Sequence, residues 1–170
     1  MPTRVQFYTY GINFSQYIRE PNLIYEVDCS QLPPPPKHLC RTGTGLDDEV
    51  ATAFWHHRQN EDRYRQAAED ICEIIQSLSR QEPGRKRSVS VAVFCKAGMH
   101  RSVAMAERLA RHFGTRYGGV MVLKPRHYDL AAGVRRQQAR LEKAQLREEM
   151  YREEGYLDDE RLGRGYLDRY

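Results

Sequence analysis

The sequence lacks the features that mark membrane, secreted and metal-binding proteins. Its 170 residues contain no apolar run long enough to span a bilayer, and we identify no signal peptide. The four cysteines show neither a C-x-x-C pair nor zinc-ligand spacing, and the adjacent His56 and His57 cannot share one helix face as metal ligands. These absences predict a cytoplasmic protein in a reducing compartment, with disulfides, metal ions, other cofactors and a membrane partner not expected.

The sequence also lacks a strong excess of charge of either sign. The 27 Lys and Arg residues nearly balance the 23 Asp and Glu residues, which leaves a formal net charge of +4. This mild excess permits nucleic-acid contact but is too small to argue for it. The chain has no G-x-x-x-x-G-K-[ST] motif, so hydrolysis of ATP or GTP is not implied. Its length suits one domain with a substantial core.

The pattern of apolar residues predicts an α/β fold. Strands are expected at Arg4–Tyr10, Leu23–Cys29, Val89–Phe94 and Val120–Leu123, and helices at Asp48–Arg58 and Glu61–Ser79, broken near Asn60. The proline run at Leu32–Lys37 favours an extended connection. We predict a small, mostly parallel sheet in a domain spanning residues 1–132. Residues 133–170 are highly charged and predict a helical extension over Val134–Glu154.

The stretch from residue 89 to residue 113 predicts a phosphate-binding element. A β-branched strand, Val89–Phe94, is followed by a short glycine-containing turn and an amphipathic helix that includes Met105–Phe113. The first N–H groups of a helix lack intrahelical acceptors and lie at the positive end of the helix dipole, so this arrangement favours anions. Arg101 adds a planar cation and Ser102 a hydroxyl group. The predicted phosphate-binding residues of this loop are Cys95, Lys96, Ala97, Gly98, Met99, His100, Arg101 and Ser102.

The same stretch resembles a known family. Residues 95–110 read C-K-A-G-M-H-R-S-V-A-M-A-E-R-L-A. They are similar to the C-terminal domain of the RapZ/YvcJ family of RNase adapter proteins, in which a Cys-Thr-Gly-Gly-x-His-Arg-Ser-Val loop runs into an Ala-Glu-Arg-Leu-Ala helix. Thr44–Asp47 matches a Thr-Gly-Leu-Asp segment of that family, and His127 and Asp129 match its closing His-Arg-Asp-Leu segment. The resemblance covers roughly Arg4 to Leu130.

The resemblance implies a ligand and two further site residues. Members of the family bind a phosphorylated amino sugar and, in some cases, small regulatory RNA. Tyr10 occupies the place of a histidine in the family's ligand pocket, although an aromatic residue capping the core explains it equally well. His127 is the second candidate. Lys96 and Ala97 replace the family's Thr-Gly, which adds positive charge and puts an unchanged ligand in doubt. The leading hypothesis is a regulatory or adapter domain that binds a phosphorylated, phosphosugar-like metabolite, with a protein partner or a second copy of the chain as further partners.

An enzyme remains the alternative. Cys95, five intervening residues and Arg101 are similar to the signature of cysteine-dependent phosphatases, in which a thiolate attacks a bound phosphate. Such an enzyme also needs a carboxylic acid to protonate the leaving oxygen. Asp47 is the acid we name for this reading, with Asp28 and Asp129 as further candidates. Phe94 stands where phosphatases usually have a histidine, which favours the binding hypothesis.

RNA binding is the third hypothesis. Its basic residues would be Lys124, Arg126 and the linker residues Arg85, Lys86 and Arg87. They form scattered clusters without an aromatic stacking motif, so the signal is weak.

Overall fold

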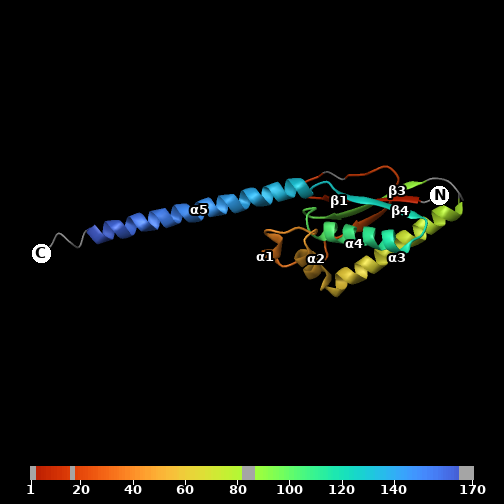
Figure 1. The fold of residues 1–170 in the computed structure, drawn as a ribbon, viewed down its shortest axis with the longest axis horizontal. Coiled ribbons are helices and arrows are strands. Elements are labelled where there is room, and N and C mark those ends of the chain that lie inside the picture. Colours follow the sequence, from red (N-terminus) through yellow and green to blue (C-terminus); the bar gives the residue numbers. More distant parts are fainter. Residues whose placement is uncertain (1–2, 16–17, 82–86, 165–170) are drawn as a thin grey trace. The chain divides into compact units, whose positions relative to one another are not determined.

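The computed structural model describes residues 3–15, 18–81 and 87–164, with side chains described up to Arg152. It is an α/β structure (Figure 1). The elements in chain order are β1 (Thr3–Gly11), β2 (Leu23–Asp28), α1 (Lys37–Cys40), α2 (Asp48–Trp55), α3 (Arg58–Gln81), β3 (Ser88–Cys95), α4 (Arg101–Arg116), β4 (Val120–His127) and α5 (Leu130–Arg164).

The four strands form one parallel sheet in the order β2-β3-β1-β4, which confirms the predicted fold class. Gly11 at the end of β1 pairs with Cys95 at the end of β3, and Asp28 of β2 pairs with Phe94. The carboxyl ends of these three strands therefore meet at one edge of the sheet. In open parallel sheets this is the edge at which ligands bind.

The helices α3 and α4 cover one face of the sheet (Figure 1). The main core lies there, built from β-branched residues of β3 and the apolar stripes of both helices, with the rings of Phe7 and Phe113 6.0 Å apart. On the other face Tyr8 and Tyr10 form a smaller apolar cluster with Ala92, against which Ile18 and Leu23 pack. The chain between β1 and β2 therefore contributes to the cover of that face in place of a helix.

The predicted break between the helices near Asn60 was wrong. The helix α2 ends at Trp55 and α3 begins at Arg58, so the break falls at His56 and His57. Asn60 is fully buried, and its side-chain amide donates to the carbonyl of Phe54 at 2.6 Å. An asparagine in the first turn of a helix thus satisfies a carbonyl at the end of the preceding one, a contact between segments that periodicity does not reveal.

The chain divides into two units, residues 1–134 and 135–170. The helix α5 begins four residues earlier than the sequence predicts, because the carbonyl of Asp129 accepts the N–H of Gly133 and starts the helix there. Among the described residues, no helix combines the length and apolarity needed to cross a membrane.

Removal of residues 135–170 should leave the first unit folded, because every residue of both apolar clusters precedes residue 135. We expect residues 1–134 to unfold in one cooperative transition, with a melting temperature close to that of the full chain. Circular dichroism during thermal denaturation measures this. A truncated chain without a cooperative transition would show that the tail is needed for folding.

Candidate anion-binding loop

The loop between β3 and α4 is shaped by close contact with the end of β1. Gly98 has φ = 69°, in the left-handed region that glycine adopts without strain. A Cβ atom there would lie 2.6 Å from the nitrogen of Gly11, and one at Gly11 would lie 2.5 Å from the carbonyl carbon of Ala97. Both positions therefore require glycine, because the two backbones touch.

Two carbonyl groups of the loop are held by the turn that follows β1. The N–H of Ile12 donates to the carbonyl of Cys95, and the N–H of Asn13 donates to that of Lys96, each at 3.0 Å. Since a trans peptide group points its N–H and C=O in opposite directions, the amides of Lys96 and Ala97 are directed away from this turn. The turn therefore orients the amides at the start of the loop.

A second turn holds the far end of the loop. The N–H of Gly45 donates to the carbonyl of Met99 at 2.8 Å, which by the same geometry directs the amide of His100 away from Gly45. A Cβ atom at Gly45 would lie 2.2 Å from the carbonyl oxygen of His100, so only glycine permits this approach. The Thr44–Asp47 segment thus forms a wall of the loop.

The N-terminus of α4 lies at the end of the loop. His100 occupies the N-cap position and makes no side-chain capping bond. The amides of the first helical turn therefore stay available to a bound anion, at the positive end of the helix dipole. This is the expected chemistry of a phosphate-binding loop.

The thiol of Cys95 is turned into the loop. Only 2% of Cys95 is exposed, its Sγ accepts the N–H of Gly98 at 3.3 Å, and it lies 3.2 Å from the hydroxyl oxygen of Ser102. Both neighbours can donate hydrogen bonds to sulfur, which is the arrangement that a nucleophilic thiolate needs. The same contacts also satisfy an inert thiol.

Arg101 reaches back to the segment that follows β2. Its Nη1 donates to the carbonyls of Ser30 and Leu32, each at 2.8 Å. The guanidinium group therefore holds the entry to the proline run beside the loop. The sequence suggests an anion contact for Arg101, and the structure adds this backbone contact, which a sequence pattern does not reveal.

His100 contacts the backbone just before the Thr44–Asp47 wall. Its Nε2 lies 3.0 Å from the carbonyl oxygen of Gly43, and burial lowers the pKa of the imidazole below its usual range. The ring is therefore neutral at pH 7, and its Nε2–H donates to that carbonyl. The contact of His100 with Gly43 and the hydrogen bond from the Gly45 N–H to Met99 both hold the wall against the loop.

The three carboxyl groups proposed as acids are all bound to nearby backbone. Asp47 is the N-cap residue of α2 but makes no side-chain capping bond; its Oδ2 accepts the N–H of Thr44 at 2.6 Å. Asp28 accepts the N–H of Ser30 at 2.6 Å. Asp129 is 6% exposed and accepts the N–H of Gly11 and the Ser15 hydroxyl; its contact to Gly11 measures 2.7 Å. Each carboxylate closes a turn at this edge of the sheet.

The side chains of the other two candidates make contacts with residues outside the loop. Tyr10 is 1% exposed and stacks on Phe94 in the apolar cluster of the opposite sheet face, with ring centroids 5.3 Å apart. His127 lies between β1 and α4, with Nδ1 3.0 Å from Thr9 Oγ1 and Nε2 3.0 Å from Glu107 Oε1. These contacts do not involve residues 95–102, which form one contiguous stretch of the chain.

Among the basic residues of the RNA hypothesis, Arg126 forms an ion pair. Arg126 pairs with Glu20 at 3.3 Å, and hydrogen bonding from Tyr128 and the nearby Glu20 carboxylate raise its pKa. Arg85 and Lys86 lie outside the described residues. In the part of the chain that the structure describes, no group of three or more His, Cys, Asp or Glu side chains is arranged to hold a metal ion.

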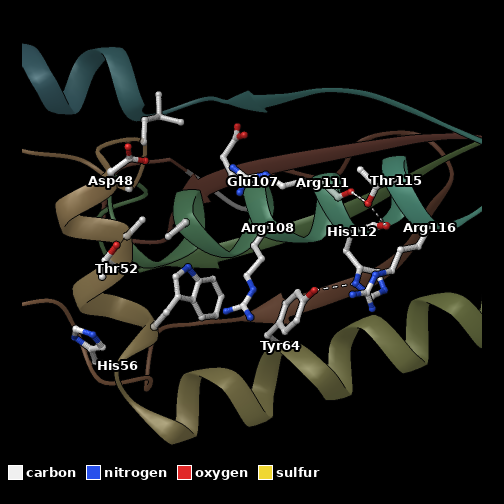
Figure 2. A pocket seen from close by; sticks show the side chains of 15 residues that line it. Asp48, Thr52, His56, Tyr64, Glu107, Arg108, Arg111, His112, Thr115 and Arg116 are labelled. Carbon is white, nitrogen blue, oxygen red and sulfur yellow. Dashed lines mark hydrogen bonds between the residues drawn. The ribbon is translucent and has the colours of Figure 1, made fainter.

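The sequence analysis missed a groove between α2, α3 and α4, with a volume of about 600 Å³ (Figure 2). The guanidinium group of Arg108 lies 4.3 Å from the ring centroids of both Trp55 and Tyr64, and it pairs with Glu61. The hydroxyl of Tyr64 is 2.9 Å from His112 Nδ1. The helical spacing of Arg108, Arg111, His112 and Arg116 was a visible signal for this basic face.

A strand, a glycine-containing loop and a helix at the carboxyl edge of a four-stranded parallel sheet define an α/β domain with a candidate site at that edge. Residues 3–130 match the model of the RapZ C-terminal domain, so the chain belongs to that family.

The chain also resembles curated relatives that carry the name nucleotide-binding protein. It is 36% identical over 110 residues to one from Polaromonas naphthalenivorans, which covers 64% of this chain and 36% of that protein. It is 39% identical over 92 residues to one from Rubrobacter xylanophilus, covering 53% and 29%. A third, from Geobacillus thermodenitrificans, is 32% identical over 102 residues, covering 59% and 32%. The chain thus spans about a third of the length of these relatives.

Substitution of Gly45 should disturb the loop and the stability of the domain together. A Cβ atom 2.2 Å from the His100 carbonyl oxygen forces a backbone shift, so we expect Gly45→Ala to lower the free energy of unfolding by roughly 1–3 kcal/mol. Gly118→Ala is the matched control, because a Cβ atom there has nothing within 4 Å. Urea denaturation of both variants measures the difference, and equal stabilities would contradict the contact.

Proposed function

We propose that this domain binds a phosphorylated metabolite through residues 95–102 and acts as a regulatory or adapter module. The observation that supports it best is the backbone of the loop. Two flanking turns hold three of its carbonyls, so that three amides point the other way, and the start of α4 has no side-chain cap. Backbone amides and a helix N-terminus bind the phosphate group itself, whatever molecule carries that group.

The side chains of the loop add positive charge. Lys96 is exposed at the position where the resemblance predicts threonine, and the guanidinium group of Arg101 is held by the carbonyl of Ser30. The resemblance of the loop implies a phosphorylated amino sugar as the metabolite, and the relatives are named for nucleotide binding. The shared chemistry of these ligands is a phosphate group with at least one negative charge.

Charge reversal at Lys96 tests this assignment. We expect Lys96→Glu to weaken the binding of inorganic phosphate and of an amino-sugar phosphate about five- to tenfold, because it replaces an attractive charge by a repulsive one. The matched control is Lys124→Glu, an exposed lysine on β4. Isothermal titration calorimetry measures both affinities. Equal affinities in the two variants would place the anion elsewhere.

A cysteine-dependent phosphatase is the second candidate, supported by the Gly98 N–H and the Ser102 hydroxyl beside the Cys95 sulfur. We favour the binding function, because Asp28, Asp47 and Asp129 already close turns in the backbone.

Hydrolysis of an aryl phosphate separates the two functions. For a binding domain we expect no turnover above the buffer rate, and unchanged phosphate affinity in Cys95→Ser, since the amides of the loop remain. Absorbance of the released phenol and calorimetry measure the two quantities. Steady turnover that disappears in Cys95→Ser would establish the phosphatase instead.

A further inference from the structure

Two of the four cysteines lie opposite each other at the ends of neighbouring strands. The register of β2 and β3 runs without a shift over its last four residue pairs and ends with Asp28 opposite Phe94. The next residues along the two strands are Cys29 and Cys95, which therefore come opposite each other. The N–H of Cys29 still donates to the carbonyl of Phe94, at 2.8 Å, so the two strands remain paired up to this point.

Both cysteine side chains lie on the same face of the sheet. Cys29 is fully buried and Cys95 is 2% exposed, and both belong to the main core cluster, as do Val27 and Val93 two residues earlier in each strand. Paired strands lie about 4.8 Å apart, and the Cα atoms of a disulfide lie roughly 4.4–6.8 Å apart. All four cysteines are free thiols in the structure. The pair is thus reduced, but its backbone spacing is the one that a disulfide requires.

We propose that Cys29 and Cys95 form a reversible disulfide under oxidising conditions, and that this bond withdraws the Cys95 sulfur from the loop after β3. Formation of the bond is independent of any ligand, whereas its effect on anion binding rests on the proposed function. In the reduced protein the Cys95 sulfur accepts the N–H of Gly98 and lies beside the hydroxyl of Ser102. A sulfur bonded to Cys29 has to turn toward β2 and away from both groups.

Hydrogen peroxide is the oxidant in this reaction. The Cys95 sulfur attacks one peroxide oxygen and the O–O bond breaks, which gives a sulfenic acid and releases the other oxygen as water with the thiol proton. The Cys29 sulfur then attacks the Cys95 sulfur. The S–O bond breaks, and the hydroxyl group leaves as water with the proton of Cys29. The two thiols give up two electrons and two protons, and one peroxide becomes two molecules of water.

The surroundings of the two sulfur atoms set the order of these steps. Two hydrogen-bond donors contact the Cys95 sulfur at the loop. Burial raises the pKa of the Cys29 thiol above its usual range, and the neighbouring Cys95 raises it further. Cys29 is therefore a neutral thiol at pH 7, so Cys95 reacts with peroxide first and Cys29 completes the bond. A resolving thiol beside the first one is typical of redox-sensing cysteines.

The disulfide should weaken anion binding. The hydrogen bond from the Gly98 N–H to the Cys95 sulfur closes the first turn of the loop, and its loss lets this turn move. An anion then has to order the loop as it binds, which costs conformational entropy. Cys95→Ser keeps an acceptor for this N–H and therefore keeps the turn. The redox state of the cysteine pair thereby controls the affinity of the loop.

Peptide mapping of the full chain tests the bond itself. Trypsin cuts after lysine and arginine, so each cysteine falls in a separate peptide, with Cys29 in residues 20–37 and Cys95 in residues 88–96. After treatment with hydrogen peroxide and alkylation of the remaining thiols, we expect mass spectrometry to find these two peptides joined. Dithiothreitol should separate them. A cross-link between any other cysteines, or oxidation of Cys95 without a cross-link, overturns the inference.

Phosphate affinity tests the effect of the bond on the loop. By isothermal titration calorimetry, we expect the oxidised chain to bind inorganic phosphate about threefold or more weakly than the reduced chain, with full recovery after dithiothreitol. In Cys29→Ala the Cys95 sulfenic acid has no resolving thiol and proceeds to the sulfinic acid, so dithiothreitol should no longer restore Cys95.

The matched control is Cys72→Ser, because Cys72 lies on α3 and serine can still accept the hydrogen bond from the Gln76 amide. This variant should form the cross-link and recover as the unchanged chain does. Thermal melting verifies that both variants are folded.

Each outcome decides one part of the inference. A Cys29–Cys95 cross-link with unchanged phosphate affinity overturns the control of the loop, and full recovery of Cys95 in Cys29→Ala overturns the role of Cys29 as the resolving thiol. A reduced chain that binds neither inorganic phosphate nor the amino-sugar phosphate overturns the proposed function, and peptide mapping then still decides whether the disulfide forms.

Discussion

The structure of the site depends on close contact between three stretches of backbone. The end of β1, the Thr44–Gly45 turn and the loop after β3 approach so nearly that Gly11, Gly45 and Gly98 have no room for a Cβ atom. Each contact uses an amide of one segment and a carbonyl of another. The result is a loop whose peptide groups are oriented without a ligand, and this preorganisation would reduce the entropy lost on binding the anion that we propose for it.

The loop itself could be predicted from the sequence because its signals are local. A β-branched strand, a glycine and a helix N-terminus lie within a short contiguous stretch, and each leaves a trace in residue type. The segments that contact the loop leave no such trace in the sequence. Ile12, Asn13 and Gly45 contact it through backbone amides, and Arg101 contacts the carbonyls of Ser30 and Leu32, so the side chains carry no information about the pairing.

The direction of Tyr10 was unpredictable for a related reason. A strand with one solvated face alternates buried and exposed residues, and the alternation tells which side chains share a face. In β1 the residues from Val5 to Gly11 are all buried, because α4 covers one face and the β1–β2 connection helps to cover the other. The pattern therefore places Tyr10 in the interior without choosing a face. The groove beside Arg108 was missed because it exists only once α2, α3 and α4 pack together.

The contacts of Cys95 are compatible with both a binding site and a phosphatase. The choice between these two functions therefore depends on whether a carboxylic acid is available to protonate the leaving oxygen. A phosphatase needs a carboxyl group free to approach the leaving oxygen and to exchange a proton. Asp28, Asp47 and Asp129 each accept a backbone N–H at 2.6–2.7 Å, so each of these carboxyl groups is already engaged by the chain. Moving any one of them toward a leaving oxygen would break that hydrogen bond, and Asp47 and Asp129 hold segments that contact the loop. Because all three candidate acids are used to hold backbone N–H groups, we favour the binding hypothesis over a phosphatase.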